Sequence, residues 1–498
     1  MIDLLFPVVR YLVFLLIFVI GLALAYVAFI FIYDLLQTKD SIRRNFPVIG
    51  RFRRMFIHLG TFFRQYFFAM DREEQPFNRA TRDWVAEKSY NRSGKIGFGS
   101  TNDLRVPGSI IFVNSPYPTL EEDKQKILPR VIGENLDTPY QPQHIVNISG
   151  MSYGALSKPA IRALSLGAKE AGIWLNTGEG GLSAYHLEGG CDLAFQIGTA
   201  KFGVRDEKGR LNKNKLKEIA RHENVKMFEL KMAQGAKPGK GGILPGVKVT
   251  REIAKIRGIS PGKDAISPNR HKEISNPDEL LDMLARIRDI TGKPVGMKTV
   301  ISTSYYPERL MNTILRRGVD YAPDFITLDG GEGGSGAAPQ ALADFVGLPL
   351  NESLPILSNL LIKSGLKQHI TLIASGKLVT PDRICWALAM GADYTVSARG
   401  FMFALGCIQS LQCHKDTCPT GITTHNKRLQ NGLVVKRKKH RVANYARHIN
   451  EEIEIIAHSC GLKSATEFNR YNVRIVQTAG VSKLLSELYP YPKSINDS

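Results

Sequence analysis

The chain has 498 residues and a mass of 55.3 kDa, and 43% of its residues are hydrophobic. A chain of this length and composition can bury a large core, which excludes a disordered or fibrous protein. The formal net charge is +20, but no nucleic-acid-binding motif accompanies the basic clusters, so nucleic acid is not an expected partner. Six cysteines are too few for a disulfide scaffold of this length, and a reducing compartment is expected.

Residues 11–33 carry no charged side chain and are long enough to cross the roughly 30 Å hydrocarbon core of a membrane as one helix. We therefore predict a transmembrane anchor over residues 1–36. A cleaved signal peptide is the alternative, although its apolar region usually spans only about 7–15 residues. Six basic residues follow the span closely: Lys39, Arg43, Arg44, Arg51, Arg53 and Arg54. Only Arg10 and the amino terminus precede it, so a single-pass protein with its main domain in the cytoplasm is expected.

Residues 37–129 form a basic, aromatic-rich connecting region without a regular pattern. Within it, the amphipathic stretch MFIHLGTFFRQYFFAM fits either a membrane surface or the surface of the main domain. Anionic lipid headgroups account for the basic residues next to the span. A second basic cluster at 436–441 is either a solvated helix face or a docking surface for an acidic electron carrier such as ferredoxin.

Residues 130–430 alternate short apolar runs, which end in glycine or polar residues, with helical patterns. This alternation is typical of parallel βα units. The predicted helices include 158–172 and 277–292. The predicted strands are the runs HIVNISGMS, IWLNTGEGG, KMFELKMAQG, PVGMKTV, DFITLDGGEGG, HITLIASGK and DYTVSARG. The count approaches eight, so we predict a (β/α)8 TIM barrel, with an open doubly wound sheet as the alternative and a helical C-terminal extension over residues 431–498.

The carboxyl ends of the predicted strands carry Gly, Ser, Asn, Lys and Gln, and this is the end of a barrel where chemistry collects. Ser375-Gly376-Lys377 and Ala398-Arg399-Gly400 end the last two strands, where barrels commonly bind phosphate through backbone N–H groups. A phosphorylated cofactor is therefore expected, although tight βα turns use the same residues. Two glycine-rich loops, 329–339 and 238–246, match no nucleotide-binding spacing, and the second is either a lid or a surface excursion.

Three cysteines lie within twelve residues directly after the last predicted strand: Cys407, Cys413 and Cys418. Thiols at this density in a chain with few cysteines suggest a redox cluster. A zinc site with His414 or His425 as its fourth ligand is the alternative.

Five segments, in order, resemble the synthase domain of glutamate synthases and the shorter FMN-binding proteins built around it. They are SGMSYGALSKPAI, NTGEGG, KMAQGAKPGKGGILPGVKVT with the following SPNRH, GGEGGSGAAP, and GCIQSLQCHKDTCPTGI, spanning about residues 147–425. The C-x5-C-x4-C spacing with its CPTG continuation is the most specific of them. The resemblance implies a (β/α)8 barrel that binds FMN, with a [3Fe-4S] cluster on the three cysteines, and thiolates are the usual ligands of such clusters.

The resemblance also implies a reaction, the reductive amination of 2-oxoglutarate by ammonia with reduced FMN, which receives electrons through the cluster. Lys231 and Gln234, with Arg251 beyond the second glycine-rich loop, supply the cation and donors that a dicarboxylate needs, although Arg251 fits a solvated surface equally well. Glu179 resembles a glutamate that helps to pass ammonia toward the flavin. A helix-capping carboxylate is its alternative role.

The flavin-contacting positions follow from the same resemblance. Lys298, in the middle of VGMKTV, is expected to stabilise the anion of the reduced flavin. Gly376, Ala398 and Arg399 are expected to hold its phosphate. The other expected contacts are Met151, Ser152, Asn176, Gln196, Gly333, Gly334 and Gly336.

The chain differs from complete glutamate synthases at both ends. At the amino end, complete glutamate synthases have a domain that releases ammonia from glutamine with an amino-terminal cysteine, whereas this chain begins Met1-Ile2-Asp3 before the apolar span. At the carboxyl end, the large β-helical domain of those enzymes is not expected. Ammonia is therefore expected from solution or from a separate amidotransferase subunit, and another amine such as methylamine, or another 2-oxo acid, is an alternative substrate. A membrane-tethered flavin and iron–sulfur electron-transfer module and a noncatalytic scaffold are alternatives from other classes.

Overall fold

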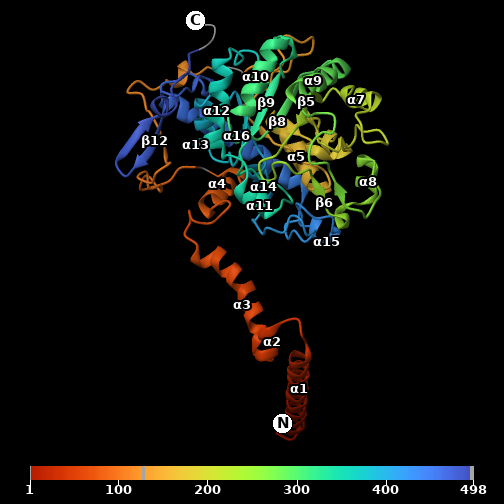
Figure 1. Ribbon diagram of the computed structural model, residues 1–498. Coiled ribbons are helices and arrows are strands. Elements are labelled where there is room, and N and C mark those ends of the chain that lie inside the picture. The colour runs from red at the N-terminus through yellow and green to blue at the C-terminus, as the bar shows by residue number, and fades with distance from the viewer. Residues whose placement is uncertain (1, 93, 126–128, 494–498) are drawn as a thin grey trace. The chain divides into compact units, whose positions relative to one another are not determined.

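A computed structural model of the protein describes residues 2–92, 94–125 and 129–493 (Figure 1). The chain folds as two compact units, Met1–Thr81 and Arg82–Ser498. The domain limits predicted at residues 36, 129 and 430 remain predictions.

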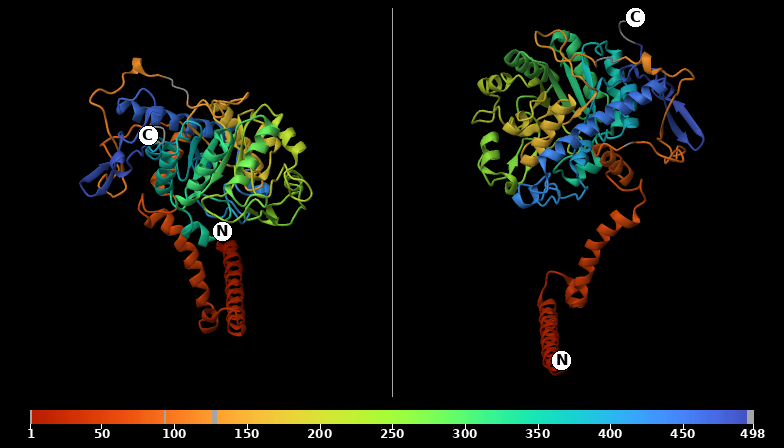
Figure 2. Two further views of the ribbon diagram at one scale, coloured as in Figure 1. Left: turned by 45° about the horizontal axis from the view of Figure 1, so that its top comes forward. Right: turned by 180° about the vertical axis from the view of Figure 1, so that it is seen from behind.

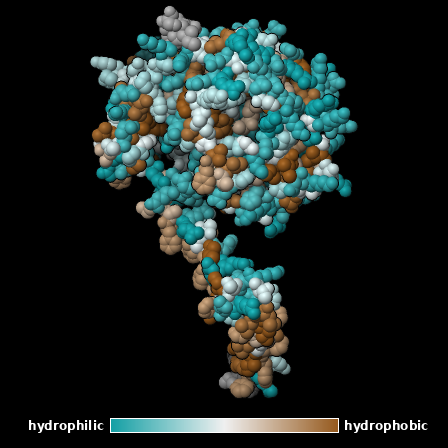
Figure 3. All heavy atoms as spheres, viewed as in Figure 1, coloured by the Kyte–Doolittle hydropathy of each residue, from teal (hydrophilic) through white to brown (hydrophobic). Residues whose placement is uncertain are grey.

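The first unit is mainly helical, and helix α4 (Arg79–Ser89) begins at its carboxyl end. Its other helical elements are α1 (Ile2–Leu36), α2 (Ser41–Asn45), α3 (Ile49–Phe63) and the π-helical turn η1 (Arg64–Phe68). Within α1, the stretch Phe6–Leu36 reaches a mean hydropathy of 3.0 and is long and apolar enough to cross a membrane. Its apolar side chains are exposed (Figure 3). A signal sequence shares this length and composition, so the membrane anchor remains a proposal.

The second unit contains a closed barrel of eight parallel strands, whose order around the barrel follows the chain. The strands are β2 (Val146–Ile148), β3 (Leu175–Asn176), β4 (Leu193–Ile197), β5 (Val225–Lys231), β8 (Val295–Thr299), β9 (Phe325–Asp329), β10 (Thr371–Ser375) and β11 (Tyr394–Ser397). Pairing of β11 with β2 closes the ring. The predicted TIM barrel is confirmed, and the doubly wound sheet is excluded.

Among the eight barrel strands, β4 is the one that the sequence analysis does not predict. All five of its residues are buried. Only one of the five residues, Ile197, is β-branched, so the composition of this run marks it only weakly as a strand. Its residue Gln196 was nevertheless an expected flavin contact.

Helices connect the strands on the outside of the barrel. They are α5 (Lys158–Ala171), α6 (Ala184–Leu187), α7 (Lys213–Ala220), α9 (Pro277–Thr291), α10 (Tyr305–Arg317), α11 (Gln340–Phe345), α12 (Leu350–Lys363), α13 (Pro381–Ala389) and α14 (Arg399–Leu405), with a 3-10 turn, η3 (Gly178–Gly180), after β3. The ends of α5 follow from its sequence, because Ser157 caps its first turn and Gly172 ends it in the left-handed conformation. The helices predicted at 158–172 and 277–292 are confirmed as α5 and α9.

An apolar cluster fills the barrel near the amino-terminal ends of the strands. Ile132 and Tyr140 form an antiparallel bridge just before the barrel and join Trp174 and Tyr394 in this cluster. The Trp174 ring lies 6.2 Å from the ring of Tyr140 and 5.3 Å from that of Tyr394. Because this end is filled with apolar side chains, the polar residues are left to the carboxyl end of the strands.

Helix α15 (Lys427–Gln430) ends just before the C-terminal extension, which contains α16 (Val435–Ser459) and α17 (Leu485–Leu488). The long helix α16 packs along α5 and against α13 and α14 (Figure 2). The extension also carries a hairpin, β12 (Val473–Thr478) and β13 (Val481–Leu484), to which β1 (Ile110–Phe112) adds a third antiparallel strand. The sequence predicts the helices here but not the hairpin.

Candidate active site

A long insertion between β5 and β8 forms one wall of the site. It contains the antiparallel pair β6 (Ile243–Leu244) and β7 (Ala265–Ile266), the turn η4 (Gly246–Lys248) and helix α8 (Arg251–Arg257). A Cβ atom on Gly242 would lie 2.4 Å from Oε1 of Glu179. The glycine-rich loop 238–246 therefore packs on Glu179, and glycine at this position leaves room for the carboxylate.

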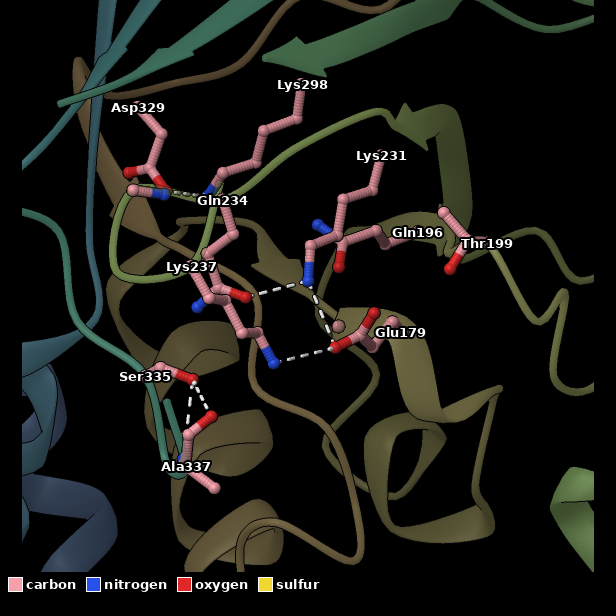
Figure 4. A network of polar contacts seen from close by, with 12 residues as sticks. Glu179, Gln196, Thr199, Lys231, Gln234, Lys237, Lys298, Asp329, Ser335 and Ala337 are labelled. Atoms are coloured by element: carbon pink, nitrogen blue, oxygen red, sulfur yellow. Dashed lines mark hydrogen bonds and ion pairs between the residues drawn. The ribbon is translucent and has the colours of Figure 1, made fainter. Parts of the chain in front are cut away.

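Glu179 is the centre of a polar network at the carboxyl ends of β3 and β5 (Figure 4). Its Oε1 lies 3.0 Å from Nζ of Lys231 and 3.8 Å from Nζ of Lys237. Lys231 Nζ also donates to Oε1 of Gln234 at 2.8 Å, and Gln234 Nε2 donates to the carbonyl of Gly334 at 2.7 Å. Three of the four expected catalytic residues thus meet in one network that reaches the glycine-rich loop after β9.

Charge determines the protonation of this network. Burial by itself raises the pKa of Glu179, but Lys231 and Lys237 outweigh it and lower the pKa to about 2. Burial lowers the pKa of Lys237 to about 8, against the attraction of Glu179. Glu179 is therefore a carboxylate at neutral pH, whereas Lys237 changes charge within the range in which enzymes work.

The two arginines of α8 differ in their surroundings. Arg251, which the sequence suggested, lies exposed at the start of the helix. Arg257, at its end, is 4% exposed, and its Nη2 donates to the carbonyl of Tyr153 at 3.2 Å. Burial lowers the pKa of Arg257 to about 10, although Glu179 attracts its charge. In the part of the chain that the structure describes, Nε of Arg257 is buried without a hydrogen-bond partner.

Sequence reasoning missed Arg257, although a signal existed. It lies one helical turn beyond the buried residues Ile253 and Ala254, on the inward face of α8. An arginine on an inward face is rare unless it is paired, so its position in the helical pattern marks it as a candidate.

Two expected flavin contacts, Asn176 and Gln196, are held by a carboxylate that the sequence analysis did not identify. Glu229 is buried in β5 and accepts hydrogen bonds from Asn176 Nδ2 at 2.9 Å, Gln196 Nε2 at 2.6 Å and Thr327 Oγ1 at 2.7 Å. The signal was an acidic residue in the otherwise apolar centre of the run KMFELK. Because both amide groups donate to Glu229, their orientation is fixed.

Met151 and Ser152 follow β2 and lie next to this group. The backbone N–H of Met151 donates to the carbonyl of Asn176 at 2.9 Å. A Cβ atom on Gly178 would lie 2.6 Å from the backbone nitrogen of Ser152. The ends of β2 and β3 are therefore in close contact at these expected flavin positions.

Lys298 lies in β8 and is 6% exposed. Its Nζ is 3.4 Å from Oδ2 of Asp329, at the end of β9 (Figure 4). Asp329 also accepts hydrogen bonds from the N–H of Gly235 at 2.8 Å and from Oγ of Ser375 at 2.7 Å. The expected cation, Lys298, is thus buried at the carboxyl end of the barrel. Its counter-ion, Asp329, also binds residues after β5 and at the end of β10.

The expected phosphate residues follow the last two strands, β10 and β11, and lie close to the glycine-rich loop after β9. Arg399, after β11, donates from Nη2 to the carbonyl of Ser335 at 2.8 Å, and Ala398 precedes it as the cap of α14. A Cβ atom on Gly334 would lie 2.7 Å from Arg399 Nε. Gly376 has a φ of 143°, which side chains rarely adopt. The expected flavin contacts Gly333 and Gly336 lie on the same loop as Gly334. The half-buried guanidinium of Arg399 therefore lies beside several glycines at the position where a phosphate was expected.

The cysteine segment follows α14. Burial raises the pKa of the Cys407 thiol, and the nearby Cys413 and Cys418 raise it further, so the three thiols are close enough to interact. Burial also raises the pKa of Cys418, but hydrogen bonds with Thr420 and Thr423 outweigh it and lower the pKa. Across residues 2–92, 94–125 and 129–493, no three His, Cys, Asp or Glu side chains are arranged to hold a metal ion. The donor set still fits a cluster, because its members are thiols.

Lys248, which the sequence analysis did not identify, connects the insertion to the cysteine segment. It is 2% exposed, and its Nζ donates to the carbonyls of Ala155 at 2.8 Å and Cys413 at 3.2 Å. His425, which was considered for zinc, directs Nε2 to the carbonyl of Gly154 at 2.8 Å, and His414 is exposed. Neither histidine completes a zinc site with the thiols in the described chain.

A parallel (β/α)8 barrel with buried cations at the carboxyl ends of its strands has the architecture of a barrel enzyme. The family model described as the conserved region in glutamate synthase matches residues 112–463. The glutamate synthase large subunit-like protein YerD of Bacillus subtilis is 41% identical over 91% of this chain and 93% of its own length. The archaeal glutamate synthase [NADPH] of Methanocaldococcus jannaschii is 34% identical over 68% of this chain and 62% of its own length.

Among solved structures, a mutant flavocytochrome b2 with pyruvate bound has a TM-score of 0.45 and 12% identity over 88% of this chain and 91% of that chain. A likeness at this level adds nothing to the assignment. The family model and the relatives are sufficient: the chain belongs to the glutamate synthase family, a family of oxidoreductases.

Proposed function

We propose that this protein catalyses the reductive amination of a 2-oxo dicarboxylic acid, with 2-oxoglutarate as substrate and ammonia as nitrogen donor. One observation carries the proposal: three buried cations, Lys231, Lys237 and Arg257, surround the single carboxylate of Glu179. Burying a cation is unfavourable unless an anion or hydrogen bonds compensate it. The local excess of positive charge suits a substrate with two carboxylates, and the unpaired Nε of Arg257 offers it a further donor.

The residues present also suit FMN, which is typical of the family. Lys298 would stabilise the anion of a reduced flavin, Arg399 and the glycine-rich loops would hold its phosphate, and Asn176 and Gln196 would contact it with fixed amides. When bound, reduced FMN supplies the hydride for the imine, and a [3Fe-4S] cluster on the three cysteines supplies its electrons.

Glu179 has a role that follows from its pKa. With Lys231 and Lys237 beside it the carboxylate stays charged, and it attracts an ammonium ion once the carboxylates of the substrate balance the two lysines. Carboxylates of the substrate share these two lysines, and this weakens their effect on Glu179. Because burial alone raises its pKa, Glu179 then accepts a proton from ammonium more readily, which frees ammonia to attack the 2-oxo carbon.

The electrons come from a separate donor protein, and the ammonia comes from outside this chain. The basic cluster 436–441 begins beside the cysteine segment, because Lys438 Nζ would lie 2.8 Å from a Cβ atom on Gly406, next to Cys407. This location supports a ferredoxin-like electron donor. Ammonia comes from solution or from a separate amidotransferase subunit. We further propose that α1 anchors the protein as a single-pass membrane protein with the barrel in the cytoplasm.

The test is an assay of the purified, chemically reduced full-length protein with 2-oxoglutarate and, in turn, ammonium, glutamine or methylamine. Flavin reoxidation is followed by absorbance, and the amino-acid product by chromatography. We expect glutamate from ammonium and no product from glutamine unless a partner is added. Preparations without bound flavin, or flavin that no amine and 2-oxoglutarate together reoxidise, would contradict the proposal.

A further inference from the structure

The helix α3 and the turn η1 carry one continuous apolar face. Its residues recur at helical spacing: Ile49, Phe52, Met55, Phe56, Leu59, Phe62, Phe63, Tyr66 and Phe67. Their exposed fractions range from 37% for Leu59 to 71% for Ile49. No residue of α3 is buried. Aromatic and aliphatic side chains in a continuous exposed patch of this kind indicate a surface that binds an apolar partner.

The opposite face is basic. Residues 41–70 contain six arginines, Arg43, Arg44, Arg51, Arg53, Arg54 and Arg64, and no aspartate or glutamate. On the helical period Arg53, Arg54 and Arg64 fall away from the apolar row, together with Ile57, His58 and Thr61. An apolar face backed by arginines is typical of a helix that lies at the surface of a membrane containing anionic lipids.

A buried ion pair fixes where this amphipathic helix begins. Asp34, two residues before the end of α1, is fully buried and accepts hydrogen bonds from Arg51 Nε at 2.8 Å and Nη2 at 2.7 Å. Its Oδ2 also accepts from the backbone N–H of Val48 at 3.1 Å. A bidentate pair of this kind has a defined geometry. The first turn of α3 is therefore held at the end of the apolar helix α1.

We propose that residues 41–68, called here the interfacial segment, lie on the surface of the membrane that α1 enters. The apolar face enters the outer part of the acyl-chain region, and Arg53, Arg54 and Arg64 of the opposite face contact anionic lipid headgroups. Direct continuity with α1 and the complete lack of acidic residues favour lipid over a protein surface as the occupant of this face. The proposal concerns attachment to the membrane and does not depend on the reaction.

The test uses tryptophan quenching by phospholipids brominated on their acyl chains. The full-length protein is reconstituted into vesicles of phosphatidylcholine and phosphatidylglycerol, and the wild-type signal of Trp84, Trp174 and Trp386 serves as the blank. Phe56→Trp reports on the apolar face, and His58→Trp is its matched control on the basic face of the same helix. Phe18→Trp, in the middle of α1, reports whether that helix is inserted.

We expect strong quenching of Phe18→Trp, clear quenching of Phe56→Trp and at most half as much for His58→Trp, because interfacial helices bury their apolar face about 5–10 Å deep. Replacing phosphatidylglycerol with phosphatidylcholine should reduce the quenching of Phe56→Trp. If Phe18→Trp is quenched while Phe56→Trp is not, or matches His58→Trp, a protein surface covers α3 and the proposal is wrong. If Phe18→Trp is not quenched, α1 is not inserted, and the proposal is equally wrong.

Discussion

The sharpest prediction concerns Gly242→Ala, because the new methyl group meets the carboxylate of Glu179. The Cβ atom would lie 2.4 Å from Oε1, whereas ordinary contacts begin at 3.4 Å, so one group must move by about 1 Å. The carboxylate is the end of a flexible side chain and moves more easily than the backbone of the loop. The fold therefore tolerates the change. We expect this movement to lengthen the contact between Glu179 Oε1 and Lys231 Nζ, which is now 3.0 Å.

A displacement of about 1 Å within a catalytic arrangement costs on the order of 100-fold in rate, and we expect a loss of that size in kcat/KM for 2-oxoglutarate. The assay is steady-state turnover with ammonium, and flavin absorbance checks that the cofactor is retained. Gly432→Ala is a matched control, because its Cβ atom would make only an ordinary contact, 3.5 Å from the carbonyl of Leu429.

A second comparison tests whether the effect passes through Glu179. Glu179→Ala removes the group that the methyl displaces, so Gly242→Ala should cost little more when it is added to Glu179→Ala. Normal kcat/KM in Gly242→Ala alone would refute the reasoning. An equal further loss in the double variant would refute it as well, because the glycine would then act on something other than the carboxylate.

Three further predictions follow from the same site. Arg257→Met should lower kcat/KM for 2-oxoglutarate about 10- to 150-fold, because a hydrogen bond to a charged group contributes about 1.5–3 kcal/mol. Arg251→Met, the matched control, should change kcat/KM little. If steady-state kinetics show the reverse order, Arg251 is the binding residue. If the reaction requires charged Lys237, kcat/KM should fall above pH about 8, because burial lowers the pKa of Lys237 to about 8. In Lys237→Arg, the fall of kcat/KM above pH about 8 should disappear from the pH profile. Cys418→Ser should remove iron and acid-labile sulfide but leave flavin absorbance, and unchanged iron content would exclude Cys418 as a ligand.

The barrel and most of its site were predictable from the sequence because the information is local. In a parallel barrel, a polar or glycine residue at the end of an apolar run lies on the catalytic face wherever that strand stands in the ring. Arg399 was expected on this ground, whereas Lys231 and Lys298, which also lie at or next to strand ends, were expected from the resemblance to the glutamate synthase family. The prediction needed no knowledge of which strands are neighbours.

The residues that were missed depend on long-range packing. Arg257 lies 26 positions after Lys231 on a helix of the insertion, and only the folding of that insertion brings it to Glu179. Lys248 looks like an ordinary basic residue until its Nζ is seen on the carbonyl of Cys413. The hairpin β12–β13 was missed for a related reason, because its partner β1 lies more than 360 residues earlier in the chain.

One short loop connects the substrate end of the site to the cysteine segment. Three consecutive carbonyls after β2 each accept a hydrogen bond: that of Tyr153 from Arg257, that of Gly154 from His425, and that of Ala155 from Lys248. His425 follows the cysteines, whereas Arg257 and Lys248 belong to the insertion. A shift of the cysteine segment must therefore strain the loop that also holds Arg257, because buried carbonyls are costly to leave unpaired. This arrangement holds the cysteine segment, where electrons are proposed to enter, at a fixed distance from the proposed substrate site. Electron transfer between the two sites requires a fixed distance.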